Sequence, residues 1–215
     1  MQMLRLLAFL MVLGGTSAAS AAPILFIGDS ITAGTPGFTS YADLLAGGDN
    51  QGHGGWTTTS WINNFSVAAA PYLEPNQTVH ILLGANDSGF DELPPIKFRN
   101  RLLELVGMLF GDGRTIYISP PYRSPTGPAW WNDLIDGYAT QVNWIWSTGA
   151  AQPGAHLWAL PPTTWDGVHP DQAGHQHIAS LLAPVLGTAV IPEPTTALLF
   201  ATGLLELAAR RRGTR

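Results

Sequence analysis

The sequence predicts an α/β fold, a three-layer α/β/α sandwich in which helices cover both faces of a parallel sheet. Short apolar runs, each stopped by glycine or proline, alternate along the chain with longer segments of helical periodicity. Parallel strands are buried on both faces and need helical connections, which this alternation supplies. The chain has 215 residues, which suits one domain of ordinary size.

Each strand is predicted from an apolar run of the kind found in buried strands. The runs cover residues 24–27, 78–83, 115–119 and 156–160, with a weaker fifth strand near 48–51. Helices are predicted at 40–46, 56–70, 96–109, 130–146 and 171–186. In the third of these, one face carries Phe98, Leu102, Leu105, Val106 and Leu109. Trp130 and Trp131 cannot share a helix face, so at least one of them is expected outside the core.

The first 21 residues are predicted to be a secretory signal peptide. Arg5 gives a positive start, residues 6–13 are apolar, and Ala19-Ser20-Ala21 has the small-x-small form that signal peptidase accepts. Cleavage after Ala21 would leave a domain over residues 22–187 and direct it out of the cytoplasm. The alternative is a buried N-terminal helix, although glycine, serine and alanine after residue 13 suit a helix end poorly.

Residues 188–215 are predicted to form a second sorting signal. Pro192-Glu193-Pro194 precedes an apolar run over residues 195–209, and Arg210-Arg211-Arg212 follows it. A basic cluster after an apolar segment stays on the cytoplasmic side of a membrane. This order resembles the PEP-CTERM sorting tail of Gram-negative bacteria. The resemblance implies an exosortase as processing partner, transient membrane association, and a cell-envelope or extracellular location. An amphipathic helix packed on the domain is the alternative.

The charge distribution argues against nucleic acid as a partner. The formal net charge is −5, but residues 22–191 hold five basic and thirteen acidic side chains, a balance of −8. Such a body lacks the basic surface that a phosphate backbone needs. The chain has no cysteine, which excludes disulfides and thiolate nucleophiles. No set of carboxylates and histidines has the spacing of a zinc site, so neither a metal nor another cofactor is expected.

Residues suited to acyl transfer follow the predicted strands, at the sheet edge where α/β folds bind ligands. Gly28-Asp29-Ser30 follows the first strand, and Gly84-Ala85-Asn86-Asp87 follows the strand at 78–83. Asp166-Gly167-Val168-His169 follows the last predicted strand, and a glycine-rich segment lies at 52–55. Acyl transfer requires a hydroxyl nucleophile, a histidine base, a carboxylate that orients the base, and donors for the oxyanion. Each motif alone is equally typical of an ordinary turn.

Together the four segments resemble the blocks of the SGNH (GDSL-type) hydrolase family, whose fold is a flavodoxin-like α/β/α sandwich with a parallel sheet. The resemblance covers residues 24–186. It implies a catalytic triad of Ser30, Asp166 and His169, and an oxyanion hole built from Ser30, Gly55 and Asn86. Gly52 and Gly54 are alternatives to Gly55 as the second-block glycine. Substitutions at Gly52 are expected to affect turnover less than the same substitutions at Gly55.

The resemblance implies an exported serine ester hydrolase that works through an acyl-enzyme and needs no cofactor. The body holds eight tryptophans, and an exposed one can stack on a sugar ring. Together with the association of PEP-CTERM tails with polysaccharide, this favours acetyl or other short-acyl esters of carbohydrate, including acylated polysaccharide, as substrates. A lipolytic or aryl esterase of the same mechanism is one alternative. A non-catalytic surface protein that binds carbohydrate is another, and loss of a triad residue would favour it.

Overall fold

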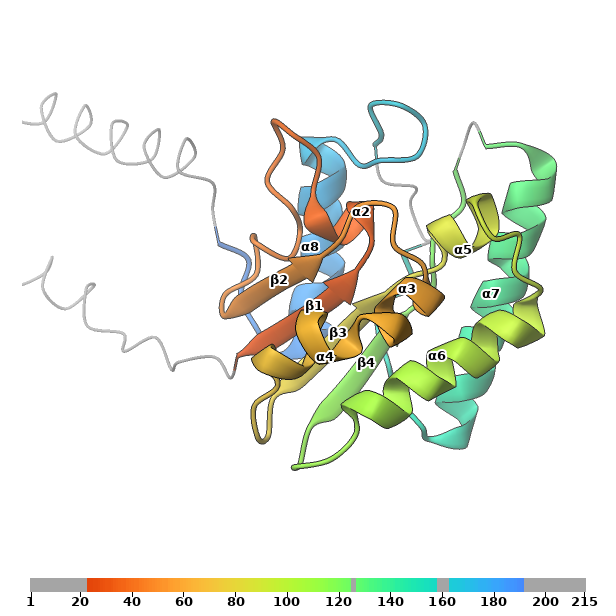
Figure 1. Cartoon of the computed structure of the whole chain (residues 1–215). Helices are drawn as coiled ribbons and strands as arrows, with labels where there is room; N and C mark the ends of the chain where they lie inside the picture. The colour runs from red at the N-terminus through yellow and green to blue at the C-terminus, as the bar shows by residue number, and fades with distance from the viewer. Residues whose placement is uncertain (1–22, 125–126, 158–162, 192–215) are drawn as a thin grey trace, which may run out of the picture.

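The computed structural model describes residues 23–124, 127–157 and 163–191, and these residues form a five-stranded parallel sheet between two layers of helices (Figure 1). The strand order is β2-β1-β3-β4-β5, which is the flavodoxin-like order. The strands are β1 (Ile24–Gly28), β2 (Gly48–Gly52), β3 (Thr78–Leu82), β4 (Thr115–Ser119) and β5 (Gln152–Pro153). The predicted fold class is confirmed.

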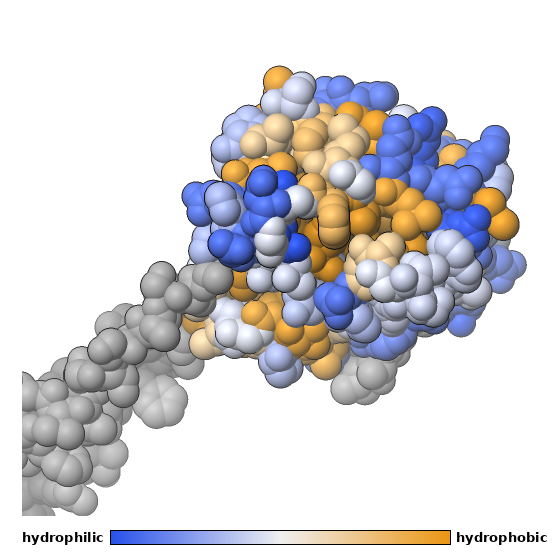
Figure 2. All heavy atoms as spheres, turned by 90° about the horizontal axis from the view of Figure 1, so that it is seen from below, coloured by the Kyte–Doolittle hydropathy of each residue, from blue (hydrophilic) through white to orange (hydrophobic). Residues whose placement is uncertain are grey.

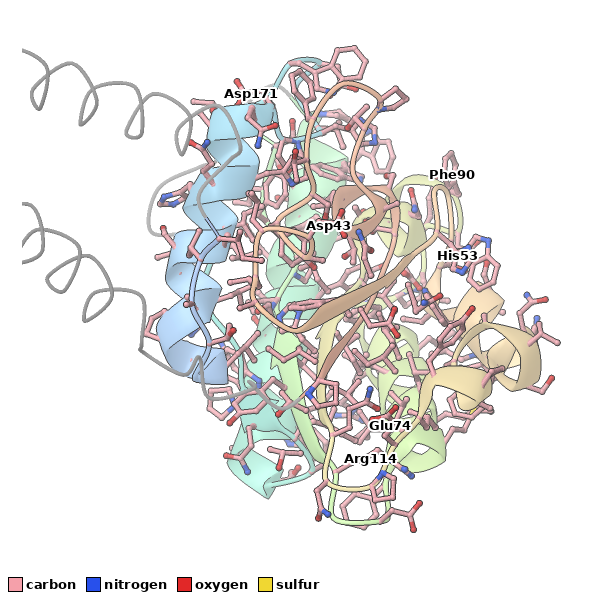
Figure 3. The ribbon with its side chains drawn as sticks, turned by 90° about the vertical axis from the view of Figure 1, so that its left-hand side faces the viewer. Asp43, His53, Glu74, Phe90, Arg114 and Asp171 are labelled. Atoms are coloured by element: carbon pink, nitrogen blue, oxygen red, sulfur yellow. The ribbon has the colours of Figure 1, made fainter. Side chains whose placement is uncertain are left out.

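The helices lie on the two faces of this sheet, as the edge-on view in Figure 3 shows. One face is covered by α3 (Thr58–Asn63), α4 (Phe65–Ala68), α6 (Pro95–Leu109) and α7 (Ala129–Thr148). The other is covered by α8 (Gln172–Leu186). The short elements α2 (Ser30–Ala33), α5 (Ala85–Gly89) and the 3₁₀ turn η1 (Ala70–Tyr72) connect strands to these layers.

Strand β1 lies between β2 and β3 in the sheet and contributes to two hydrophobic cores. Leu25 and Ile27 belong to the core beneath α6 and α7, whereas Ile24 and Phe26 belong to the core beneath α8. This alternation follows from the two-residue period of a strand, and burial on both faces explains why the run is apolar throughout. Burying this apolar surface is the main favourable term in folding.

Most predicted elements are confirmed. The strands near 24–27, 48–51, 78–83 and 115–119 are present, and the three long helices differ from prediction by at most two residues at either end. All five apolar side chains predicted on one face of α6 are buried. Trp131 is buried and Trp130 is 49% exposed, as expected for neighbours on a helix.

The helix predicted at 40–46 is wrong, because this segment forms a series of turns. Ser40 accepts a hydrogen bond from the Ala42 N–H through its hydroxyl, which it also donates to the Thr32 carbonyl at 2.5 Å. Serine side chains that bond to nearby backbone in this way compete with helix formation. A backbone bridge between Leu45 and Val190 then holds the end of the segment.

The single helix predicted at 56–70 is instead divided into α3, α4 and η1. The division occurs at Asn64, whose backbone has φ −110° and ψ 11°. Its side-chain amide donates to the Ser60 carbonyl at 2.8 Å. Asparagine favours such local bonds over helix continuation, and Pro71 ends the segment within η1.

Of the strand predicted at 156–160, only residues 156 and 157 lie within the described part of the chain, and neither belongs to a strand. The fifth strand is β5, where Gln152 and Pro153 pair with Tyr117 and Ile118 of β4. The Gly154 N–H still donates to the Ile118 carbonyl, but Pro153 has no N–H to extend the ladder. Leu157 is nevertheless buried, in the core beneath α8, although it is not part of a strand.

The predicted signal peptide and residues 192–215 of the predicted PEP-CTERM tail lie outside the described residues. Within residues 23–124, 127–157 and 163–191, no helix is both long enough and apolar enough to cross a membrane.

The two ends of the sheet can be located in the figures. Figure 2 views the molecule from below and shows hydrophobic surface bordered by hydrophilic residues. Glu74 and Arg114, which precede β3 and β4, lie at this lower end, whereas Asp171, the N-cap residue of α8, lies at the opposite end (Figure 3). The carboxyl ends of the strands therefore meet at the end marked by Asp171.

We expect fully buried His80 to reduce stability in acid. Burial lowers its pKa to about 3, whereas a histidine in an unfolded chain titrates near 6.5. Between these values only the unfolded chain takes up the proton, so stability falls as the pH falls through this window. His80→Gln removes the titration, and its free energy of unfolding should improve relative to wild type by up to about 1.4 kcal/mol per pH unit below pH 6. Urea unfolding from pH 7 to pH 4 measures the difference, and a constant difference would contradict it.

Candidate active site

The residues predicted for catalysis meet at the carboxyl edge of the sheet. In the register of the three neighbouring strands, Gly28 lies between Gly52 and Leu82. The loops that follow β1, β2 and β3 therefore begin side by side at the carboxyl edge of the sheet. Ser30 begins α2 immediately after β1, and Asn86 lies in the first turn of α5 after β3.

Ser30, His169 and Asp166 form a continuous chain of hydrogen bonds. Ser30 Oγ lies 2.9 Å from His169 Nε2, and His169 Nδ1 lies 2.7 Å from Asp166 Oδ2. A carboxylate on Nδ1 fixes the tautomer with its proton on that nitrogen, which leaves Nε2 free to accept the serine proton. Ser30, His169 and Asp166, the three residues that the family resemblance assigns to a triad, are therefore in contact in the structure.

Asp166, the acidic residue of this hydrogen-bonded series, is held in its charged form. Asp166 Oδ1 accepts the backbone N–H groups of Val168 and His169 at 2.9 and 2.7 Å. Partial burial of Asp166 favours its protonated form, but the hydrogen bonds from His169 and Val168 outweigh this and hold the pKa of Asp166 below its usual value. The carboxylate therefore stays ionised at neutral pH and can stabilise a positive imidazole.

Two residues after β4 support the turn that carries His169. The Tyr122 hydroxyl donates to the Val168 carbonyl, and the Ser124 hydroxyl donates to the Gly167 carbonyl. Neither residue is predicted from the sequence. Their position after a predicted strand is the only signal that the sequence carries, because a hydroxyl that bonds to a distant carbonyl leaves no local pattern.

The turn that presents Ser30 is held from two sides. Asp29 caps α2 by accepting the Ile31 N–H at 2.9 Å, and the Trp61 indole N–H donates to the Gly28 carbonyl at 3.1 Å. Burial raises the pKa of Asp29 to about 7, partly opposed by the bond from Ile31 and reinforced by the nearby Asp87 carboxylate. The aspartate next to the nucleophile is thus far less acidic than Asp166.

Gly55 occupies a turn that suits an oxyanion donor. The Trp56 N–H donates to the His53 carbonyl at 3.2 Å, and Gly55 has φ +78° at the third position of this turn. This is the position that favours glycine in a type II turn. Among the described residues the Gly55 N–H has no acceptor. It is therefore free to donate to a substrate oxygen.

Asn86 is positioned by the same turn. Its side-chain Nδ2 donates to the Trp56 carbonyl at 3.0 Å. An amide nitrogen carries two hydrogens, so one remains for a ligand. The structure thus brings Asn86 to the glycine turn, as the sequence predicted.

Aromatic rings border the catalytic residues. The His53 and Trp56 rings stack with centroids 4.0 Å apart, and the rings of Trp165 and His169 lie nearly parallel at 6.2 Å. Trp165 is 55% exposed. Figure 3 shows His53 on the side of the molecule covered by α3.

A metal site is not part of this arrangement. Within the part of the chain that the structure describes, no three His, Asp or Glu side chains are grouped so that they could hold a metal ion. His175, one of the histidines near the triad in sequence, is fully buried, and its Nδ1 accepts the Tyr41 N–H at 3.3 Å. Burial lowers its pKa to about 4.

The fold and the hydrogen-bonded chain define a serine hydrolase of the α/β class. The model of the GDSL-like lipase/acylhydrolase family matches residues 26–177. The chain therefore belongs to this family, the SGNH hydrolases, and is a serine carboxylic ester hydrolase.

Solved structures share the fold. One is Axe2, an acetylxylan esterase from Geobacillus stearothermophilus, which is 20% identical with a TM-score of 0.64 over 81% of this chain and 98% of that chain. A catalytic mutant of Axe2 matches with a TM-score of 0.66 at the same identity and coverage. LAE5, an alpha/beta hydrolase from the metagenome of Lake Arreo, Spain, is 20% identical with a TM-score of 0.61, over 80% of this chain and 98% of that chain. A search of curated protein sequences gives no match.

The structure reverses the expected ranking of Gly52 and Gly55. A Cβ at Gly52 would lie 2.1 Å from the Ala33 N atom, in the backbone of α2, whereas a Cβ at Gly55 would meet nothing within 4 Å. Substitution at Gly52 therefore displaces the helix that carries Ser30. Substitution at Gly55 costs only the strain of a positive φ, about 1–2 kcal/mol.

We expect Gly52→Ala to lower both the melting temperature and kcat/KM more than Gly55→Ala. Gly54→Ala is the matched control, since its φ is not positive and a Cβ there meets nothing within 4 Å. Thermal unfolding and ester hydrolysis of the three variants measure the order. A Gly52→Ala variant as active and as stable as Gly54→Ala would show that α2 is not held by this contact.

Proposed function

We propose that Ser30, His169 and Asp166 are the catalytic triad of an exported esterase that removes acetyl or other short acyl groups from carbohydrate. The continuous hydrogen-bonded chain from Ser30 to Asp166 is the observation that carries the catalytic part of this proposal. It combines a nucleophile, a base with an available nitrogen, and an ionised acid at the ligand-binding edge of the sheet.

The reaction proceeds in two halves. His169 Nε2 takes the proton of Ser30 Oγ as this oxygen attacks the ester carbonyl carbon, and Asp166 stabilises the imidazolium. The tetrahedral intermediate then collapses, His169 protonates the departing alcohol oxygen, and the acyl group remains on Ser30. Water repeats the sequence on the acyl-enzyme and releases the carboxylic acid.

The negative oxygen of each tetrahedral intermediate is stabilised by preorganised donors. The Ser30 N–H lies at the start of α2, where no helical acceptor is available to it. The free Gly55 N–H and the second hydrogen of the Asn86 amide complete the set. Such donors gain strength in a protein site because they are already oriented when the charge develops.

Two features support a carbohydrate ester as substrate, and two predicted sorting signals support export. Trp165 presents an exposed ring next to His169, as a sugar platform would require. Axe2, which shares the fold, is an acetylxylan esterase. The predicted signal peptide and PEP-CTERM tail support export to the cell envelope or beyond, with an exosortase as processing partner and transient membrane association. A lipolytic or aryl esterase remains the second candidate, because the family is described by lipase and acylhydrolase activities.

Ser30→Ala should fold normally and lose activity by a factor of about 10⁴ or more, because the triad acts as a unit. Ser147→Ala, which removes an exposed hydroxyl near the end of α7, is the control and should keep wild-type activity. Hydrolysis of p-nitrophenyl acetate measures both. A Ser30→Ala variant that retains a tenth of the wild-type rate would remove Ser30 from the mechanism.

Trp165→Ala should raise KM for acetylated xylo-oligosaccharides about fivefold, which corresponds to roughly 1 kcal/mol of stacking, and leave p-nitrophenyl acetate little affected. The control is Trp144→Ala, since Trp144 is similarly exposed but lies beneath Arg99 near the far end of α7. Equal effects on both substrates would argue against a sugar platform.

A panel of p-nitrophenyl esters from acetyl to palmitoyl tests the acyl group, and highest activity on palmitate would favour the lipolytic alternative.

A further inference from the structure

Asp87 is a fully buried carboxylate that the proposed mechanism does not use. It lies in the first turn of α5, one residue after Asn86. Its two oxygens lie 3.1 and 3.2 Å from the Thr58 backbone N, and Oδ1 also accepts the Thr58 hydroxyl at 2.5 Å. Buried carboxylates are costly unless they are paired or fully hydrogen-bonded, so this arrangement calls for an explanation.

The partner of Asp87 belongs to the segment that carries the glycine turn. Thr58 follows Gly55 by three residues and Trp56 by two. Asn86 Nδ2 donates to the Trp56 carbonyl, while Asp87 accepts from Thr58. Two successive residues of α5 thus hold two points of one short segment; we call this pair of contacts the α5 clamp.

No backbone–backbone hydrogen bond joins residues 53–58 to residues 84–89 among the described residues. The two segments follow β2 and β3, which are not neighbours, because β1 lies between them. Polar side chains therefore supply the hydrogen bonds that join the glycine turn to α5.

This alignment matters because an oxyanion hole requires donors that converge on one point. The Gly55 N–H comes from one segment and the Asn86 amide from the other. A small shift between the segments would leave both donors present but no longer directed at the same oxygen. Loss of a single oxyanion donor lowers kcat by factors of 10² to 10³. Loss of one contact that only aligns the two donors should therefore lower kcat by a smaller factor.

We propose that Asp87 is a positioning residue that aligns the Gly55 N–H with the Asn86 amide through its contacts with Thr58. The inference rests on the oxyanion roles proposed above. The fraction of charged Asp87 is set by its surroundings: burial raises its pKa to about 6, and the Thr58 bonds oppose this. The groups that face it are the carboxylates of Asp29 and Asp91 and the phenol of Tyr138.

The direct test is Asp87→Asn, which keeps the shape of the side chain but has one acceptor oxygen instead of two. We expect kcat for p-nitrophenyl acetate to fall about tenfold while KM changes less than twofold. Affinity for phenylboronic acid, which forms a tetrahedral adduct with an active serine, should fall by the same factor as kcat, because the clamp acts on the tetrahedral state. A purely structural role would not separate boronate affinity from KM.

Thr58 provides the second arm of the test. Thr58→Val removes the hydroxyl but keeps the N–H, and should lower kcat about threefold, whereas Thr58→Ser should keep most of it. In the double variant of Asp87 and Thr58 the losses should be less than multiplicative, because both changes break the same contact. Ile116→Val is the stability control, since this buried residue of β4 lies at the opposite end of the sheet.

The proposal is overturned if folded Asp87→Asn keeps kcat and boronate affinity within twofold of wild type, or if its loss matches that of Ile116→Val at equal melting temperature. If Asp87→Asn does not fold, Thr58→Val decides, and unchanged kcat in that variant overturns the proposal. An active Ser30→Ala enzyme would instead refute the proposed function. The two failures are therefore distinguishable.

Discussion

The register of the parallel sheet is the constraint on which the rest of the site depends. Gly28, Gly52 and Leu82 lie side by side in three adjacent strands, so the chain leaves the sheet three times at one level. At Gly28 a side chain is excluded, because a Cβ would lie 1.8 Å from Thr32 Oγ1 and 2.9 Å from the Leu82 carbonyl oxygen. A shift of one residue in this register would separate Ser30 from Asn86 and reverse the faces of every strand residue.

The surroundings of Asp29, Asp87 and Asp166 then give these three carboxyl groups different pKa values. Burial raises the pKa of Asp29 to about 7 and that of Asp87 to about 6, which reduces negative charge behind the nucleophile. Asp166 is only partly buried and accepts several hydrogen bonds, so its pKa stays low. Charge is thereby retained on Asp166, where it stabilises an imidazolium, and is reduced on Asp29, next to the nucleophile. Carboxyl groups whose pKa values are made to differ in this way by their surroundings are typical of catalytic sites.

The sequence was most informative where physical signals are local. Glycines and polar residues after apolar runs predicted the sheet edge at which the catalytic segments meet, and the resemblance to the SGNH family implied the contact between Ser30 and His169. The turns at 40–46 and the break at Asn64 were missed, because side-chain bonds to the backbone override apolar spacing there. Gly52 was ranked too low, since its closeness to Ala33 arises only when β1 and β2 pair. Tyr122, Ser124 and the α5 clamp were missed for the same reason: each joins segments that are distant in the chain.

The central claim is that Ser30 is activated by His169 and Asp166. The most direct measurement is stoichiometric labelling of residues 22–191 with a fluorophosphonate, followed by mass spectrometry of the peptides, because only an activated serine reacts readily. The account predicts one adduct per chain, located on Ser30, and its loss in His169→Ala. An adduct on another serine, or no adduct on the folded protein, would contradict it.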